Sequence, residues 1–126
     1  MATHPTAVQN GIADYVVDLV DTGSTDAQGD LVFMTVGSVE VATLSMANPA
    51  FGSAAAGVAT AGTIANDSAA TGGTIDKFKL VDRDNGTVVE GSCSLVAGGG
   101  EMELTSLVIA PGEQVSVSSL TYTAPS

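Results

Sequence analysis

The sequence predicts a mainly β fold: an antiparallel β-sandwich or barrel of about seven strands with one N-terminal α-helix. Before Asp21, apolar residues recur every three or four positions, as they do on one face of a helix. After Asp30 they recur nearly every second position, and turn residues return about every ten positions. This change of period marks the point where the helix gives way to short antiparallel strands.

The helix is expected over residues 6–21, within a single domain that covers residues 1–126. Its expected apolar face consists of Val8, Ile12, Tyr15, Val16, Leu19 and Val20. A loop is expected over residues 22–30, because "TGSTDAQGD" is rich in turn-forming residues. The remaining β body is expected to span residues 31–123.

Strands are predicted over residues 31–36, 39–46, 57–64, 74–82, 87–96, 101–109 and 113–123. Asn85-Gly86 predicts a two-residue type I′ hairpin between the fourth and fifth, because both residues tolerate positive φ angles. Gly98–Gly100 and Pro111-Gly112 predict two further turns. The fifth to seventh strands are therefore expected to form an antiparallel meander.

The last predicted strand changes its pattern half-way along. Val115 and Val117 occupy odd-numbered positions, which lie on one face of a strand, whereas Leu120 and Tyr122 occupy even-numbered positions, which lie on the other. Such a shift predicts a bulge or a change of pairing partner near the Ser118-Ser119 step. The end of this strand is therefore a candidate for pairing with a neighbouring subunit, and Tyr122 is a candidate interface residue.

Composition excludes several classes of partner. The 126 residues suit one domain, and three basic against 14 acidic residues give a net charge of −11. This charge repels phosphate backbones and anionic lipids, so neither nucleic acid nor a membrane is expected as a partner. No signal peptide and no apolar run of ~20 residues is evident, so the protein is expected to be soluble and made inside the cell.

Residues able to do chemistry are few, and the sequence predicts a protein without enzymatic activity. The only histidine, His4, lies next to Pro5 near the terminus, and no nucleophile motif accompanies it. The only cysteine, Cys93, alternates with Gly91 and Leu95 and is predicted to be a buried small hydrophobe. One cysteine also excludes an internal disulfide and a structural zinc site. No catalytic residue, cofactor or metal is expected.

Two acidic features have a functional alternative. "DRDNG", residues 82–86, resembles the start of a calcium loop, but the twelfth position of an EF-hand register would be Cys93 rather than Glu. A polar hairpin turn is favoured, with a weak calcium contact between subunits as the alternative. Glu101 and Glu103 share one side of a predicted strand, where a solvated face is favoured over a catalytic carboxylate pair.

All three basic residues, Lys77, Lys79 and Arg83, fall in the sequence "DKFKLVDR". They are expected to pair internally with Glu90 across the hairpin, or alternatively to dock against an acidic neighbour. Residues 42–61 contain no ionisable side chain and are the other candidate interface, with Asn48, Pro49 and Phe51 at its centre. Small uncharged side chains can lie flat against another protein at little cost in conformational entropy, and the backbone groups of this segment are expected to remain available for strand-like pairing.

Two stretches carry a family resemblance: "ATLSMANPAFGSAAAGVATAGTIANDSAATGGTIDKFKLVDRDNGTVVEGS", residues 42–92, and "VSVSSLTYTAPS" at the end. From about Leu31 onward the chain resembles a family of small proteins encoded in the head-gene region of tailed bacteriophages. The family pattern runs from "PAFG" through a Gly-Val-Ala-Thr-Ala strand to a "D-x-D-G" turn. Here an extra Asn85 separates Asp84 from Gly86.

This resemblance implies a virion structural protein, most specifically a capsid decoration (cement) protein that binds the head surface and stabilises it. It implies a major capsid protein as partner, a homo-oligomer such as a trimer, and no catalytic residues. Two alternatives stay open: a head-to-tail or tail accessory subunit, and a host-attachment or carbohydrate-binding module. The absence of Trp disfavours the carbohydrate-binding module, because sugar sites generally need exposed aromatic rings.

Overall fold

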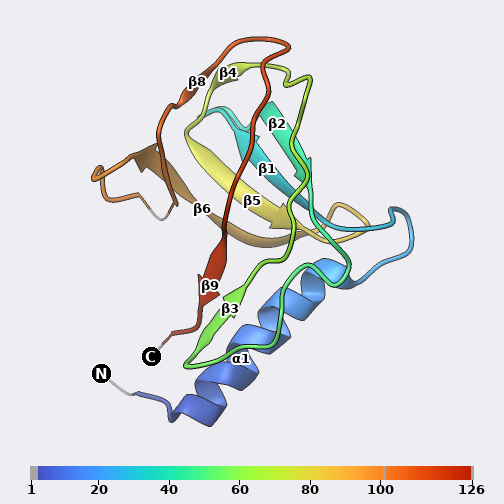
Figure 1. Cartoon of the computed structure of the whole chain (residues 1–126), viewed down its shortest axis with the longest axis vertical. Coiled ribbons are helices and arrows are strands. Elements are labelled where there is room, and N and C mark those ends of the chain that lie inside the picture. Colours follow the sequence, from blue (N-terminus) through green and yellow to red (C-terminus); the bar gives the residue numbers. More distant parts are fainter. Residues whose placement is uncertain (1–2, 101, 126) are drawn as a thin grey trace.

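The computed structural model describes residues 3–100 and 102–125, and it confirms a mainly β fold with one N-terminal helix (Figure 1). The order β2-β1-β5-β6-β7 forms a curled five-stranded sheet, and β3-β9 and β4-β8 form two small ladders. The strands are β1 Asp30–Met34, β2 Glu40–Ser45, β3 Val58–Thr60, β4 Gly73–Thr74, β5 Lys77–Val81, β6 Thr87–Leu95, β7 Met102–Leu104, β8 Val108–Ile109 and β9 Thr121–Thr123. Short β segments thus replace several of the longer strands expected.

The N-terminal helix lies where it was predicted. Helix α1 spans Thr6–Asp18 and continues as the 3-10 helix η1, Leu19–Asp21. It packs against β3 and β9 (Figure 1). The expected apolar face is wrong in part, because Tyr15 is 69% exposed whereas Ala13 and Val17 are buried. These smaller side chains allow the helix to lie close to the short ladder, and the larger Tyr15 points away from it.

The central strands pair in antiparallel fashion, β2 with β1, β1 with β5 and β5 with β6. This confirms the predicted pairing on either side of Asn85, but the two-residue type I′ turn is wrong. The connection spans residues 82–86, and of Asn85 and Gly86 only Asn85 has a positive φ, at 64°. The Asp82 Oδ1 atom accepts the backbone N–H groups of Asp84 and Gly86 at 2.9 and 2.8 Å, and so stabilises this longer loop.

The outer edge of β2 is covered by an irregular segment, residues 64–72. The Ala65 N–H donates to the Ser45 carbonyl at 2.8 Å, and the Thr43 N–H donates to Asp67 Oδ2 at 2.9 Å. A carboxylate thus accepts a bond that a neighbouring strand would otherwise accept. The cover protects the edge from pairing with other chains, and the predicted strand 57–64 is reduced to β3.

The predicted antiparallel meander at the C-terminal end is wrong, because β7 runs parallel to β6. The glycine-rich connection passes very close to the end of β6. A Cβ atom added at Gly98 would lie 2.8 Å from Ser94 Oγ, and the Gly100 N–H donates to that oxygen at 3.0 Å. Only glycine permits this approach, which brings the chain back beside β6 in the same direction. Glu101, part of the predicted carboxylate pair, lies outside the described residues.

The predicted change of pairing partner in the last segment is confirmed. Val115 forms a bridge with Asp67, whereas Tyr122 pairs with Ala59 of β3. The Pro111-Gly112 turn is also present, with Gly112 at φ 81°. The segment after it pairs with residues 67–70 instead of returning along β8. Residues 113–120 therefore cross the sheet as an irregular chain, not as the long strand expected (Figure 1).

One apolar core joins α1, the inner face of the main sheet and the β3-β9 ladder. Its largest fully buried side chains are Phe33, Leu31, Leu44, Met46, Val17, Val20 and Val41, and a separate small cluster consists of Val32, Met34 and Val81. The described part of the chain contains no helix that is both long and apolar enough to cross a bilayer.

Candidate protein-docking site

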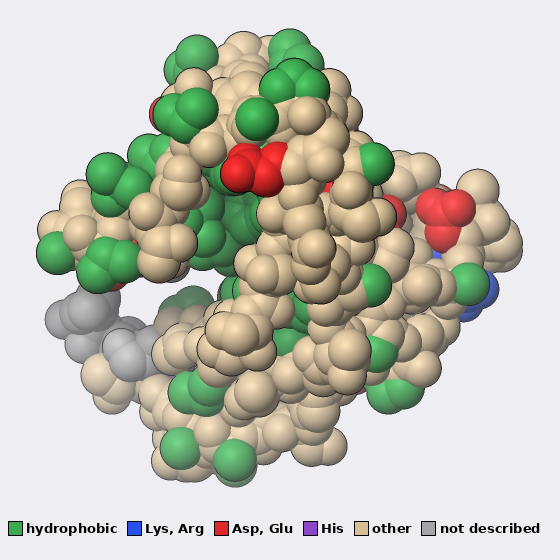
Figure 2. Space-filling view, turned by 45° about the horizontal axis from the view of Figure 1, so that its top comes forward, with side chains coloured by type: hydrophobic (Ala, Val, Ile, Leu, Met, Phe, Trp, Pro, Cys, Tyr) green, Lys and Arg blue, Asp and Glu red, His purple; other side chains and the backbone are tan. Residues whose placement is uncertain are grey.

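A groove follows the C-terminal chain where it crosses the sheet. It consists of three hollows of about 230, 280 and 350 Å³, and the hollow of about 350 Å³ shares lining residues with each of the other two. We call it the C-terminal groove. Residues 102–106 form one wall, residues 113–122 form the other, and the remaining lining side chains are Phe33, Phe51, Ile75, Phe78, Leu80, Val89 and Ile109. Figure 2 shows hydrophobic side chains gathered at the base of a hollow on this face.

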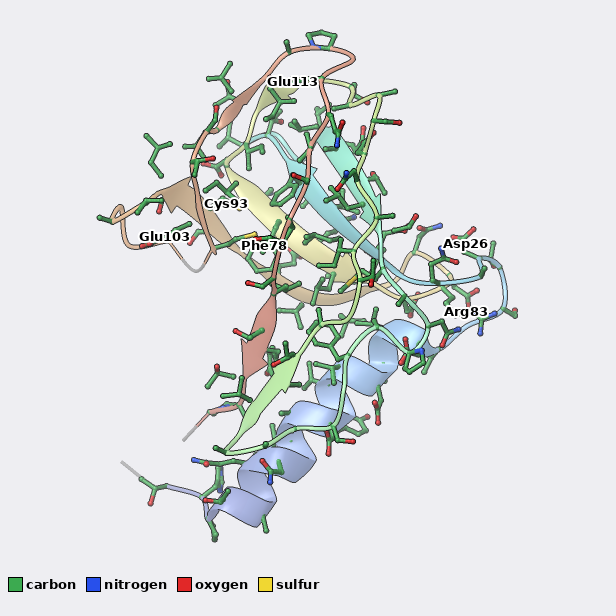
Figure 3. All side chains as sticks on the ribbon, in the orientation of Figure 1. Asp26, Phe78, Arg83, Cys93, Glu103 and Glu113 are labelled. Carbon is green, nitrogen blue, oxygen red and sulfur yellow. The ribbon has the colours of Figure 1, made fainter. Side chains whose placement is uncertain are left out.

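The groove is apolar at its base, hydroxyl-bearing along its walls, and acidic. Glu103 and Glu113 are the only charged residues among the described residues that line it. Both are exposed, and both stabilise turns: Glu103 Oε2 accepts the Gly99 N–H at 3.3 Å, and Glu113 Oε2 accepts the Ala110 N–H at 2.9 Å. Figure 3 shows Glu113 at the top of the molecule and Glu103 beside the β6–β7 connection. The groove therefore presents negative charge near both ends.

Two of the residues predicted as interface candidates meet in this groove. Phe51 and Tyr122 both line the hollow of about 280 Å³. Phe51 is 5% exposed and forms a bridge with Ala61, so it is buried beneath its own loop. Tyr122 is half-buried and lies opposite Ala59 in the β3-β9 ladder.

The uncharged segment that contains Phe51 lies against the protein's own helix. Polar side chains of α1 and η1 accept its backbone N–H groups. The bonds are Asp21 Oδ1 to Ala50 N at 2.8 Å, Asp14 Oδ1 to Ala54 N at 2.7 Å, and Asn10 Oδ1 to Gly57 N at 2.8 Å. These three amides are therefore occupied internally, which corrects the expectation that the backbone of residues 50–57 is available to a neighbour.

Asn48 and Pro49 lie at the exposed start of this segment and outside the groove. The peptide bond between them is cis. The side-chain amide of Asn48 donates to the Ala27 carbonyl at 3.1 Å, which ties the segment to the loop after η1. The structure thus places these two residues away from Tyr122.

The three basic residues lie on and beside β5. The sheet register places Lys79 opposite Glu90, as the internal pairing requires. Lys77 Nζ donates to Ser38 Oγ at 2.6 Å, and Arg83 Nε donates to the Asp26 carbonyl at 2.7 Å. Figure 3 shows Arg83 and Asp26 near one another at the loop end of the molecule. Lys77 and Arg83 therefore brace turns of their own chain.

The residues considered for chemistry are dispersed. His4 is exposed near the N-terminus. Cys93 is half-buried rather than buried as expected, because it lies on β6 toward the edge of the main sheet, where Leu95 is already 51% exposed. Burial, with a smaller effect from Asp76, raises the pKa of its thiol from 9.0 to about 11. The thiol therefore stays protonated at neutral pH and is a poor nucleophile.

The acidic turn after β5 uses its carboxylates on the backbone. Asp84 Oδ1 accepts the N–H groups of Ser24 and Thr25 at 3.0 and 2.9 Å. These bonds lower the pKa of Asp84. Across residues 3–100 and 102–125, no group of three His, Cys, Asp or Glu side chains is placed to hold a metal ion.

Comparisons with protein-family models, with curated proteins and with solved structures give no match.

The groove itself was not predicted, although one sequence signal pointed to part of it. The parity break at Ser118-Ser119 marks where the C-terminal chain leaves one partner for another, and both serines line the groove. The opposite wall, residues 102–106, carries no comparable signal, because its position depends on the parallel return beside β6.

Proposed function

We propose that this protein is a structural component of a bacteriophage virion, most specifically a capsid decoration (cement) protein. In this proposal it binds the head surface and stabilises it through contacts between subunits. The observation that carries the proposal is an apolar groove beside a short, two-stranded ladder on a strongly acidic chain. Apolar grooves and strand edges are common means of binding protein segments. The resemblance of residues 42–92 and 115–126 to phage head-region proteins adds the viral context.

The proposal assigns the protein a binding role without a catalytic step. Its partner is the major capsid protein, and its location is the outer surface of the capsid after synthesis in the host cytoplasm. The β-sandwich or barrel of about seven strands is also part of the proposal. It is supported by the main apolar core, which the curled sheet shares with the β3-β9 ladder.

We further propose a symmetric homo-oligomer, for which a trimer would suit a three-fold position of a capsid. Exposed apolar side chains supply surfaces for such contacts. Val36 and Val39 flank the β1–β2 turn at 79% and 61% exposure, and Val108 of β8 is 69% exposed. Leu95 and Val96 lie at the end of β6 and are also exposed. Burying these side chains between subunits would stabilise the assembly.

The test is reconstitution on heads that lack this protein. Purified protein is mixed with such heads and, separately, with purified tails from the same phage, and each mixture is sedimented. The proposal predicts saturable co-sedimentation with the heads and greater resistance of those heads to heat. Binding to tails alone would support the tail accessory alternative instead. Binding to neither particle would contradict a structural role on the virion.

A further inference from the structure

We propose that the C-terminal groove binds an extended, basic segment of another protein, which pairs with the free edge of β9 and places apolar side chains on the groove floor. This inference goes deeper into the proposed function by naming the chemistry of the bound partner. It rests on that function only for the identity of the partner. The binding chemistry follows from β9, the lining of the groove and the distribution of charge.

Strand β9 has one paired and one unpaired edge. The Ala61 N–H donates to the Leu120 carbonyl at 2.8 Å, and the Ala124 N–H donates to the Gly57 carbonyl at 2.9 Å. Antiparallel strands direct alternate residues to alternate edges, so Thr121 and Thr123 direct their N–H and C=O groups away from β3. Within the described chain, no strand pairs with β9 on that side.

The unpaired edge lies beside the apolar part of the groove. Residues 119–122 line the hollow of about 280 Å³, whereas no residue of β3 does. Across the hollow are Phe78 and Leu80 of β5 and Met102 of β7. Figure 3 shows Phe78 on the sheet behind the C-terminal chain. A strand added to β9 would therefore have backbone partners on one side and an apolar surface beneath alternate side chains.

The charge of the groove selects a basic occupant. Its lining contains Glu103 and Glu113 and, among the described residues, no Lys, Arg or His. The whole chain carries −11, so an acidic segment would be repelled during approach as well as on binding. Lysine or arginine at the ends of an extended segment would lie near the two carboxylates.

A second copy of this chain is a poor occupant for the same reason. The chain has only three basic residues, and Lys77 and Arg83 already bond to Ser38 and to the Asp26 carbonyl. The occupant is therefore a different protein, and subunit contacts within the oligomer use other surfaces.

The experiment uses the full chain and three synthetic peptides as probes. The first alternates valine and lysine over eight residues, the second replaces each lysine by glutamate, and the third is the lysine peptide with N-methyl groups on alternate backbone nitrogens. Fluorescence anisotropy measures binding, and NMR hydrogen exchange measures protection of the Thr121 and Thr123 amides. We expect the lysine peptide to bind at least tenfold more tightly than either of the other two and to slow exchange at both amides.

Glu103→Gln tests the contribution of charge at the groove. Glutamine keeps an acceptor for the Gly99 N–H but removes the negative charge, so binding of the lysine peptide should weaken by about two- to fivefold, as expected for one partly exposed ion pair. Glu90→Gln is the matched control, because Glu90 is also exposed but does not line the groove. It should change binding less than Glu103→Gln does.

The inference would be overturned by equal binding of the lysine and glutamate peptides, by binding without slower exchange at β9, or by equal effects of the two variants. Protection of the Thr121 and Thr123 amides that depends on protein concentration alone would also overturn it, because the occupant would then be a second copy. The proposed virion role is tested by a different experiment, so it can fail while the groove inference holds. If the protein does not co-sediment with heads but binds the lysine peptide as described, the groove inference stands and the virion proposal falls.

Discussion

Replacing Phe51 by alanine tests the core beneath the uncharged segment. The side chain is 5% exposed, and an aromatic residue buries roughly 150–250 Å². At about 25 cal/mol per Å² this corresponds to an upper limit of roughly 4–6 kcal/mol. The hollow of about 280 Å³ beside Phe51 is already open to solvent, so water can enter the new space and the cavity contribution is small. We therefore expect a loss near 3 kcal/mol, the lower end of the range for Phe→Ala.

The assay is thermal and urea unfolding of the wild type and the variant at equal protein concentration. For a chain of this size, a loss of 3 kcal/mol corresponds to a fall in Tm of roughly 9–15 °C. Tyr15→Ala is the matched control, because this aromatic residue is 69% exposed and its removal should change the free energy of unfolding by less than about 0.5 kcal/mol. A Phe51→Ala change as small as that of the control would refute the burial argument.

Asp14→Ala should lower the free energy of unfolding by about 1–2 kcal/mol, because it leaves the half-buried Ala54 N–H without its acceptor. Asp18→Ala, on the exposed side of the helix, is the control and should lower it less. Equal losses in urea unfolding would contradict the contact between the helix and the loop. Because the folded-state pKa of Cys93 is raised, the unfolded chain ionises first as pH rises, so the free energy of unfolding should fall between pH 9.0 and about 11 relative to Cys93→Ser. A constant difference in the free energy of unfolding between the two proteins over that pH range would contradict the raised pKa of Cys93. Light scattering at micromolar concentration should give a mass above the 12.4 kDa of one chain, and a mass of 12.4 kDa with cooperative unfolding would count against an oligomer.

Local patterns in the sequence were sufficient for the helix and for the central strands. The helical period before Asp21 gave α1 and η1, and near-alternation after Asp30 gave β1, β2, β5 and β6 at nearly their observed positions. The side of the helix that is buried was less predictable. The periodic pattern favoured large residues such as Tyr15, but close packing against β3 selected the smaller Ala13 and Val17.

The C-terminal third depended on contacts that no local pattern records. The direction of β7 follows from the close approach of Gly98 and Gly100 to Ser94, and glycines alone equally suggest an antiparallel turn. The cover on β2 depends on one carboxylate, Asp67, that accepts a backbone bond from Thr43. The candidate site shares this limitation, because one wall of the groove is the return through β7. Of the residues predicted as interface candidates, only Phe51 and Tyr122 line the groove.

The central claim is that this chain binds the outer surface of a phage head. A cryo-electron microscopy reconstruction of virions that carry it tests this claim most directly. The account predicts density for the curled five-stranded sheet and helix α1 on the outside of the capsid, repeated with the capsid symmetry, and an extended segment of the capsid protein beside β9. Density for the chain only at the portal or the tail, or none on the particle, would contradict the account.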